Sequence, residues 1–123
     1  MALLISVVDD DGASRAAVTG LLRSMGHDAV GFASAAEFLA SDELGRTGLL
    51  IADQRMPEIT GLDLRRRLLA VGASIPMALM TAYPTEAGRR QALAAGIFSY
   101  LTKPISPGDL TACIAAAQSG PLR

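Results

Sequence analysis

Two stretches of the sequence, Leu3-Leu4-Ile5-Ser6-Val7-Val8 and Leu49-Leu50-Ile51-Ala52, decide the fold because both are short and almost continuously apolar. A strand with one face in water alternates apolar and polar residues, whereas a strand buried on both faces does not. Both stretches have the length of a strand, and an aspartate follows each of them directly. They therefore indicate a sheet whose two faces are both covered.

Short apolar runs alternate with longer helical patterns along the whole chain. The predicted strands are residues 3–8, 28–32, 48–52, 75–81 and 98–101, and the predicted helices are residues 12–25, 34–43, 61–71, 85–95 and 106–118. This alternation is typical of right-handed β-α-β crossovers. The sequence thus predicts an α/β domain, doubly wound, with a parallel sheet and helices on both faces.

Two helix starts carry capping chemistry. Ser34 followed by Glu37 is a capping-box pattern, in which each side chain accepts a hydrogen bond from a backbone N–H of the first turn. Ser106-Pro107 places a proline at the first helical position, and Asp109 three residues after the serine strengthens that start. These patterns predict helices that begin near residues 34 and 106.

Glycines mark the predicted helix ends. Gly26, Gly72 and Gly96 stand where helices are expected to stop, because glycine adopts the left-handed cap conformation without strain. Gly88 is the exception, since it lies inside the predicted helix 85–95 and costs about 1 kcal/mol relative to alanine. We expect that helix to be the least stable of the five.

Length and composition indicate one globular domain. The chain has 123 residues, half of them hydrophobic, and its formal net charge of −1 excludes a basic nucleic-acid-binding domain. The single cysteine, Cys113, cannot form an internal disulfide and is expected in the core. The apolar start, residues 1–8, is too short to span a membrane, so we expect a soluble cytoplasmic protein. Residues 1–118 are expected to form the domain, and residues 119–123 a C-terminal tail or the start of a linker.

Polar residues stand at the ends of four predicted strands. Asp9-Asp10-Asp11 follows the first, Asp53 the third, Thr81 the fourth, and Lys103, the only lysine, the fifth. Ligands of open parallel sheets bind beyond the carboxyl ends of the strands. Adjacent first and third strands would gather Asp9, Asp10 and Asp53, whose crowding raises a pKa or demands a cation. Oxygen ligands without a nearby histidine or cysteine favour a hard ion, and Mg²⁺ fits best.

These residues are suited to phosphoryl transfer. Asp53 stands alone at its strand end and is the expected nucleophile, forming an acyl phosphate, while Asp9 and Asp10 hold the metal ion. A transferring phosphoryl group carries negative charge on three equatorial oxygens, so positioning and electrostatics do most of the catalysis. Mg²⁺, Lys103 and the Thr81 hydroxyl supply one partner for each oxygen. The sequence therefore predicts a metal-assisted phosphate site.

Four motifs occur in order along the chain: Val8-Asp9-Asp10, Asp53-Gln54-Arg55-Met56-Pro57 with Gly61, Thr81-Ala82, and Lys103-Pro104. With these motifs at these separations, the sequence resembles the receiver domains of two-component response regulators over essentially its whole length. The resemblance implies a flavodoxin-like receiver fold with five parallel strands in the order 2-1-3-4-5. It also implies that Mg²⁺ is held by Asp10, Asp53 and the main-chain carbonyl of Arg55.

The function that the resemblance implies is a phosphorylation-driven switch. A histidine kinase or phosphotransfer protein would phosphorylate Asp53 from its phosphohistidine, and no turnover of an external substrate is expected. Thr81 would then turn toward the phosphoryl group and Tyr100 would swing inward behind it. The surface of the fourth helix, fifth strand and fifth helix would change shape and control an output domain, a protein partner or a homodimer. The Asp-x-Arg-Met-Pro form resembles receivers that regulate transcription; the domain itself is not expected to bind nucleic acid or a membrane.

Three positions depart from the commonest pattern of that family. Ile105 stands where a phenylalanine usually follows Lys-Pro, Arg55 is a long cation two residues past the phosphoacceptor, and Tyr83-Pro84 is bulkier than usual. We expect Arg55 and Tyr83 to overhang the phosphoryl group and to tune the access of water to it. Outside the site, we predict that Arg65-Arg66-Arg67 forms a solvated helix face together with Asp63.

Other protein classes share parts of this pattern. A phosphohydrolase of the haloacid dehalogenase type would use Asp9 in an Asp-x-Asp pattern, but it needs a late acidic pair, and only Asp109 follows Lys103. A flavodoxin-like cofactor binder would wrap phosphate in the loop after the first strand, where three aspartates would repel it. An inert receiver-like interaction module is the third alternative, and the intact site residues argue against it.

Overall fold

The computed structural model describes residues 3–119, in which five strands alternate with helices. The strands are β1 (Leu4–Val8), β2 (Asp28–Phe32), β3 (Leu49–Asp53), β4 (Met77–Thr81) and β5 (Ser99–Thr102). The helices are α1 (Gly12–Ser24), α2 (Ala35–Leu39), the 3₁₀ helix η1 (Asp42–Arg46), α3 (Gly61–Ala70), α4 (Glu86–Ala94) and α5 (Pro107–Ser119). All five predicted strands are present.

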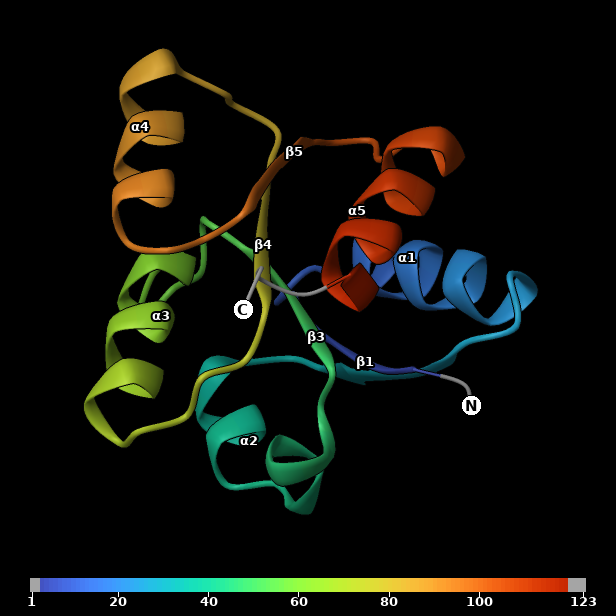
Figure 1. The fold of residues 1–123 in the computed structure, drawn as a ribbon, viewed down its shortest axis with the longest axis horizontal. Coiled ribbons are helices and arrows are strands. Elements are labelled where there is room, and N and C mark those ends of the chain that lie inside the picture. Colours follow the sequence, from blue (N-terminus) through green and yellow to red (C-terminus); the bar gives the residue numbers. More distant parts are fainter. Residues whose placement is uncertain (1–2, 120–123) are drawn as a thin grey trace.

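The strands form one parallel sheet in the order β2-β1-β3-β4-β5, as expected (Figure 1). Val8 at the end of β1 pairs with Phe32 of β2 and Ala52 of β3, and Thr81 of β4 pairs with Thr102 of β5. The carboxyl ends of β1, β3, β4 and β5 therefore lie along one edge of the sheet, which is where the predicted site residues follow.

Alternate residues of the central strands enter two separate cores, one on each face of the sheet. One core lies under α2, α3 and α4 and takes Val8, Leu50, Ala52, Met77 and Leu79 from the strands. The other lies under α1 and α5 and takes Ile5, Val7, Leu49, Ile51, Ala78 and Met80, together with Cys113 of α5. Every residue of β3 and β4 is buried. The continuously apolar stretches are thus strands covered on both faces, as predicted.

The predicted helix ends are confirmed at three glycines. Gly26, Gly72 and Gly96, which follow α1, α3 and α4, have φ angles of 90°, 77° and 87°. This left-handed conformation is strained for residues with a side chain and open to glycine. The predicted start of the last helix is confirmed as well, because the Asp109 N–H donates to the Ser106 hydroxyl at 3.0 Å.

The second helix is shorter than predicted. Residues 34–43 were expected to be helical, but α2 ends at Leu39 and η1 follows it. The hydroxyl and the N–H of Ser41 both donate to the Phe38 carbonyl, at 2.7 and 3.1 Å, and this tightens the last turn. Ser41 thereby competes with the α-helical ladder, a local contact that apolar periodicity does not reveal.

The carboxyl-terminal boundary of the domain stays a prediction. Ser119, the first residue of the predicted tail, is the last residue of α5, and residues 120–123 lie outside the described part of the chain. Within residues 3–119, no helix has both the length and the apolar character needed to cross a membrane.

Candidate functional site

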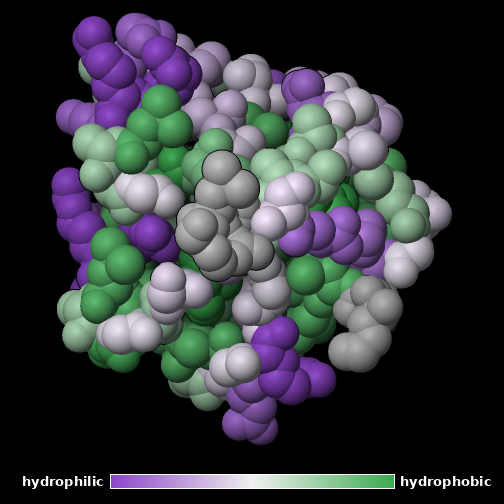
Figure 2. Space-filling model, viewed as in Figure 1, coloured by the Kyte–Doolittle hydropathy of each residue, from purple (hydrophilic) through white to green (hydrophobic). Residues whose placement is uncertain are grey.

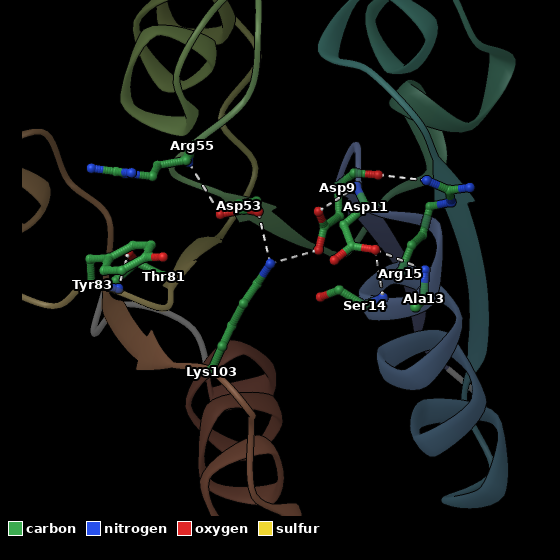
Figure 3. A network of polar contacts seen from close by, with 10 residues as sticks. All are labelled: Asp9, Asp11, Ala13, Ser14, Arg15, Asp53, Arg55, Thr81, Tyr83 and Lys103. Atoms are coloured by element: carbon green, nitrogen blue, oxygen red, sulfur yellow. Dashed lines mark hydrogen bonds and ion pairs between the residues drawn. The ribbon is translucent and has the colours of Figure 1, made fainter.

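The predicted site residues meet at the carboxyl edge of the sheet (Figure 3). Asp9 directly follows β1, Asp53 ends β3, Thr81 ends β4 and Lys103 directly follows β5. Asp9, Asp53 and Thr81 are buried, with exposed fractions of 0%, 7% and 3%. Residues from four strands, separated by up to 94 positions in the chain, are thus brought to one place.

Lys103 joins the two buried carboxylates. Its ammonium donates to Asp9 Oδ2 at 2.9 Å and to Asp53 Oδ2 at 2.8 Å, and its side chain is 18% exposed. Figure 3 shows the lysine side chain extended from the end of β5 between the two aspartates. Two negative charges therefore face one positive charge, which leaves this cluster negative overall.

The two buried aspartates have pKa shifts of opposite sign. Burial disfavours ionisation of Asp9, but the nearby side chains of Ser14 and Lys103 and the hydrogen bond from the Asp11 N–H outweigh it and lower the pKa of Asp9. For Asp53, burial together with the charge of Asp9 raises the pKa despite Lys103. Burial by itself would lower the pKa of Lys103, but the hydrogen bonds to both carboxylates raise it. Asp53 is therefore the carboxylate whose charge the fold stabilises less.

Backbone groups hold both carboxylates in place. The Asp11 N–H donates to Asp9 Oδ1 at 3.0 Å, and the Arg55 N–H donates to Asp53 Oδ1 at 3.1 Å. Gly61 allows the close return of the chain beside Asp53, since a Cβ at Gly61 would lie 2.8 Å from the Asp53 carbonyl oxygen. Each aspartate thus has one oxygen fixed by an N–H and the other by Lys103.

Arg15 supports the loop after β1, a role that the sequence alone did not suggest. Its guanidinium donates to the Asp9 carbonyl at 2.6 Å, and its aliphatic stem packs on Gly31 of β2. The available signal was a cation one turn after the helix start at Asp11, where the helix dipole does not favour positive charge. Asp11 itself is the exposed N-cap of α1, since its carboxylate accepts from the N–H of Ala13.

The donor set fits a hard divalent cation. Carboxylate oxygens of Asp9, Asp10 and Asp53 lie within 4.8 Å of one another; Asp10 is exposed and the other two are buried. Three carboxylates against one ammonium leave an excess of negative charge, and oxygen-only ligands suit Mg²⁺. The contribution of the Arg55 main-chain carbonyl stays a prediction.

The two predicted switch residues, Thr81 and Tyr100, have hydrogen-bond partners other than Asp53. The Thr81 hydroxyl accepts a hydrogen bond from the Tyr83 N–H at 3.0 Å, and the Tyr100 hydroxyl accepts one from the Thr85 N–H at 3.4 Å. Among residues 3–119, no hydrogen bond joins either hydroxyl to Asp53. Both hydroxyls are therefore occupied by backbone groups of the segment between β4 and α4.

Arg55 and Tyr83 meet across the site. The guanidinium carbon of Arg55, in the loop after β3, lies 4.6 Å from the centre of the Tyr83 ring, in the loop after β4. The tyrosine is 65% exposed, and Figure 3 shows the pair beside Asp53 on the side away from Asp9. This cation–π contact connects two loops whose backbones hold Asp53 and Thr81.

The prediction of a solvated face for Arg65-Arg66-Arg67 is wrong for Arg65. Its guanidinium is buried and donates to the carbonyls of Ile75, Ala95 and Gly96 at 3.1, 3.0 and 3.3 Å. Arg66 and Arg67 are exposed as expected. The error arises because the carbonyls that receive Arg65 lie 10 to 31 residues away in sequence. The carbonyls of Ala95 and Gly96 lie at the carboxyl end of α4, so Arg65 fixes that end of α4 to α3.

A groove of about 570 Å³ lies beside Lys103, between α1 and the segment that follows β5. Apolar side chains make most of its wall, among them Ala13, Ala17, Leu21, Ile105 and Leu110. The groove also includes Lys103 and Asp11, so it leads to the edge of the charged cluster.

Comparisons with known proteins agree with this geometry. The family model described as the response regulator receiver domain matches residues 5–115. The chain is 36% identical over 116 residues to the response regulator protein TodT of Pseudomonas putida, which covers 94% of this chain and 51% of TodT. It is 34% identical over 113 residues to the transcriptional regulatory protein TdiR of Thauera aromatica, covering 92% and 50%. The crystal structure of a response regulator receiver protein from Pseudomonas putida superposes with a TM-score of 0.83 at 30% identity, covering 94% of this chain and 97% of that one. The chain therefore spans about half the length of the curated relatives it matches.

Proposed function

The chain belongs to the family of response regulator receiver domains, and from this we propose that it accepts a phosphoryl group on Asp53 and switches a protein surface in response. The donor is the phosphohistidine of a histidine kinase or phosphotransfer protein. The observation that carries the proposal is the cluster in which Lys103 bridges Asp9 and Asp53 at 2.9 and 2.8 Å. It combines a nucleophile, a cation for the phosphoryl oxygens and acidic ligands for Mg²⁺.

Asp53 acts as the nucleophile. One of its carboxylate oxygens attacks phosphorus while the P–N bond of the phosphohistidine breaks, and the imidazole nitrogen leaves with the bonding pair. Lys103 neutralises one equatorial oxygen of the transferring group, and the Thr81 hydroxyl donates to another. Asp9, Asp10, Asp53 and the Arg55 carbonyl hold Mg²⁺, which supplies charge neutralisation to the phosphoryl oxygens when bound.

The groove beside Lys103 is the approach that we propose for the donor. Its wall is largely apolar, it is formed by α1 and by Ile105 after β5, and it leads to Lys103. A partner helix that carries a histidine could bury an apolar face there and present the imidazole toward Asp53. Ile105, which replaces the usual phenylalanine of the family, would contact that helix.

The output surface that we propose is made of α4, β5 and α5. Strongly hydrophilic side chains gather over α4 (Figure 2), and the exposed residues of its outer face include Arg89 and Arg90. The exposed face of α5 differs from it, since Thr111, Ala112 and Ala115 are uncharged and small. Small, uncharged residues favour close packing against a second copy of the domain, an output domain or another partner. The similarity to relatives such as the transcriptional regulatory protein TdiR supports a role in transcription.

The remaining predictions belong to the same proposal. Residues 1–118 form the receiver domain, residues 119–123 are a tail or the start of a linker, and the protein acts in the cytoplasm. The domain catalyses its own phosphorylation and dephosphorylation and turns over no external substrate. The family match does not favour a phosphohydrolase that uses Asp9 or a flavodoxin-like cofactor binder.

The test is the intact mass of the protein after incubation with Mg²⁺ and acetyl phosphate, beside the variant Asp53→Asn. We expect a labile adduct of one phosphoryl group in the parent protein and no adduct in the nearly isosteric variant. An adduct retained in Asp53→Asn would mean another acceptor. No adduct in the parent at any Mg²⁺ concentration would mean an inert module, and sustained hydrolysis of a small phosphate ester would indicate a phosphohydrolase.

A further inference from the structure

Gly88 breaks a pattern that three other helices, α2, α3 and α5, follow. Four helices begin with a serine or threonine whose hydroxyl accepts the N–H of the third helical residue, and in three of them that third residue is acidic. The pairs are Ser34 with Glu37, Thr60 with Asp63, Ser106 with Asp109, and Thr85 with Gly88. An acidic residue suits this position because it caps a further N–H and complements the helix dipole.

The backbone of α4 does not require this glycine. Gly88 lies inside the helix and is not among the glycines with positive φ. Glycine in a helix is disfavoured relative to alanine because it loses more conformational freedom on folding. Neither backbone conformation nor helix propensity accounts for a glycine at position 88.

The hydroxyl of Tyr100 occupies the space that a side chain at position 88 would take. A Cβ built on Gly88 would lie 2.7 Å from the Tyr100 Oη, closer than Cβ atoms normally approach any atom, but an ordinary 3.5 Å from the Tyr100 Cζ. The same Cβ would lie 3.0 Å from the Thr85 Oγ1, which already accepts the Gly88 N–H at 2.9 Å as the helix cap. The closest approach is therefore to the phenolic oxygen, and the contact with the Thr85 Oγ1 is tight as well.

We infer that Gly88 is a positioning residue for the switch: it holds open the resting seat of the Tyr100 ring at the amino-terminal end of α4. The seat consists of the Thr85 N–H, which donates to the Tyr100 hydroxyl, and the empty space at Gly88. Its regulatory meaning rests on the proposed function, in which Tyr100 leaves this seat on phosphorylation.

A methyl group at position 88 removes the seat and leaves the rest of the site in place. The ring of Tyr100 must move, or the first turn of α4 must shift, before any phosphoryl group arrives. The conformation in which the Tyr100 ring has left its seat then becomes more populated. A ligand that binds this conformation gains apparent affinity by the factor by which its population rises. Gly88→Ala should thus mimic part of the effect of phosphorylation.

A double-mutant cycle in urea unfolding tests the contact itself, with Gly20→Ala as the matched control. Gly20 is a solvent-exposed glycine in α1, and a Cβ there meets no atom within 4 Å. We expect Gly20→Ala to lower the unfolding equilibrium constant about fivefold, as helix propensity predicts. Gly88→Ala should raise that constant in the parent and lower it in the Tyr100→Phe background, where the phenolic oxygen is gone. Equal stabilisation by Gly88→Ala in both backgrounds would overturn the inference.

Tyrosine ring signals in NMR spectra test the effect on the switch. The chain has two tyrosines, so Tyr83→Phe assigns the Tyr100 signal. We expect Gly88→Ala to move this signal, without ligand, in the direction that Mg²⁺ with beryllofluoride moves it in the parent. The apparent affinity for beryllofluoride should rise about threefold or more. An unmoved Tyr100 signal in Gly88→Ala would overturn the inference.

The two proposals fail in different ways. A parent protein that forms no Asp53 adduct and binds no beryllofluoride overturns the proposed function, while the unfolding cycle still measures the seat. In the converse result, the parent protein forms the Asp53 adduct while the effects of Gly88→Ala and Tyr100→Phe on unfolding are additive. That result overturns the inference about Gly88 and leaves the proposed function standing.

Discussion

The site has two halves that differ in their contacts. The charged half is Asp9, Asp53 and Lys103, and the hydroxyl half is Thr81 and Tyr100. Lys103 contacts both Asp9 and Asp53, at 2.9 and 2.8 Å. Thr81 and Tyr100 instead accept hydrogen bonds from backbone N–H groups of the segment between β4 and α4. The charged groups that we propose for phosphoryl acceptance are therefore already joined, whereas the two hydroxyls that we propose for the switch are bound to backbone groups instead.

The difference follows from the strength of the interactions involved. Opposite charges in a buried place attract strongly and come together without a ligand, since either one alone would be costly to bury. A neutral hydroxyl gains about 1 kcal/mol from a hydrogen bond and accepts the nearest available donor. A phosphoryl group on Asp53 would offer Thr81 a charged acceptor, which is a stronger partner than the Tyr83 N–H.

The largest effect is expected from breaking the charged half with Lys103→Ala. Two carboxylates would remain in the site without their shared cation, so we expect a loss of about 3 kcal/mol in the free energy of unfolding without Mg²⁺. Urea unfolding with EDTA measures this loss. Added Mg²⁺ should restore much of the stability, because the acidic ligands remain, but the phosphorylation-induced change should be impaired.

The control for Lys103→Ala is Arg89→Ala, which removes an exposed ion pair with Glu86 and should change stability little. A collapse of Mg²⁺ affinity in Lys103→Ala would contradict the separation of roles between lysine and acidic ligands.

In Mg²⁺-free buffer, replacing Asp53 and replacing Asp9 should change the free energy of unfolding in opposite directions at neutral pH. The pKa of Asp53 is raised by burial, so its ionisation costs stability once the pH exceeds the unfolded value of about 3.9. Asp53→Asn should therefore gain stability at pH 7, and the gain should vanish as the pH falls toward 4. Urea unfolding across this pH range measures the difference between variant and parent.

Asp9 provides the matched comparison. The pKa of Asp9 is lowered by its hydrogen bonds, so its ionised form stabilises the fold above the unfolded pKa, and this contribution is lost as the pH falls through the folded value. Asp9→Asn should therefore lose stability at pH 7. The same sign for both variants would contradict the assignment of Asp53 as the less stabilised carboxylate.

The smallest effect is expected at the contact that joins the two halves. Arg55 and Tyr83 stand beside Asp53 as a cation–π pair, and we expect them to shield an acyl phosphate from water. Arg55→Ala should shorten the lifetime of the phosphorylated protein about threefold, equivalent to roughly 0.7 kcal/mol of barrier. The decay of the phosphoryl adduct, followed by intact mass, measures this lifetime.

Two tyrosine variants sharpen this last prediction. Tyr83→Ala should resemble Arg55→Ala, whereas Tyr83→Phe keeps the aromatic face and should keep the lifetime. Identical lifetimes in Tyr83→Ala and the parent would show that the stacked pair does not protect the phosphoryl group.

Much of this protein could be predicted from the sequence because the relevant signals are local. Strands buried on both faces have continuous apolar residues, helix caps lie within four residues of the groups they satisfy, and glycines with positive φ end three helices. The carboxyl edge of a parallel sheet then assigns Asp9, Asp53, Thr81 and Lys103 to one region. These features depend on the chain's own neighbours and on one general rule of topology.

Features that join distant segments could not be predicted, because they depend on how the elements pack. Arg65 looks like part of a charged helix surface, yet it is buried among carbonyls 10 to 31 residues away. Gly88 looks like a defect in α4, yet the Tyr100 hydroxyl, 12 positions along the chain, occupies the place of its side chain. Periodicity and propensity describe a residue within its own element, whereas such contacts are set by how packed elements approach one another. The amino-acid sequence therefore determined the layers and the chemistry of the edge, and the packing of α3, α4 and β5 determined where the Arg65 and Tyr100 side chains lie.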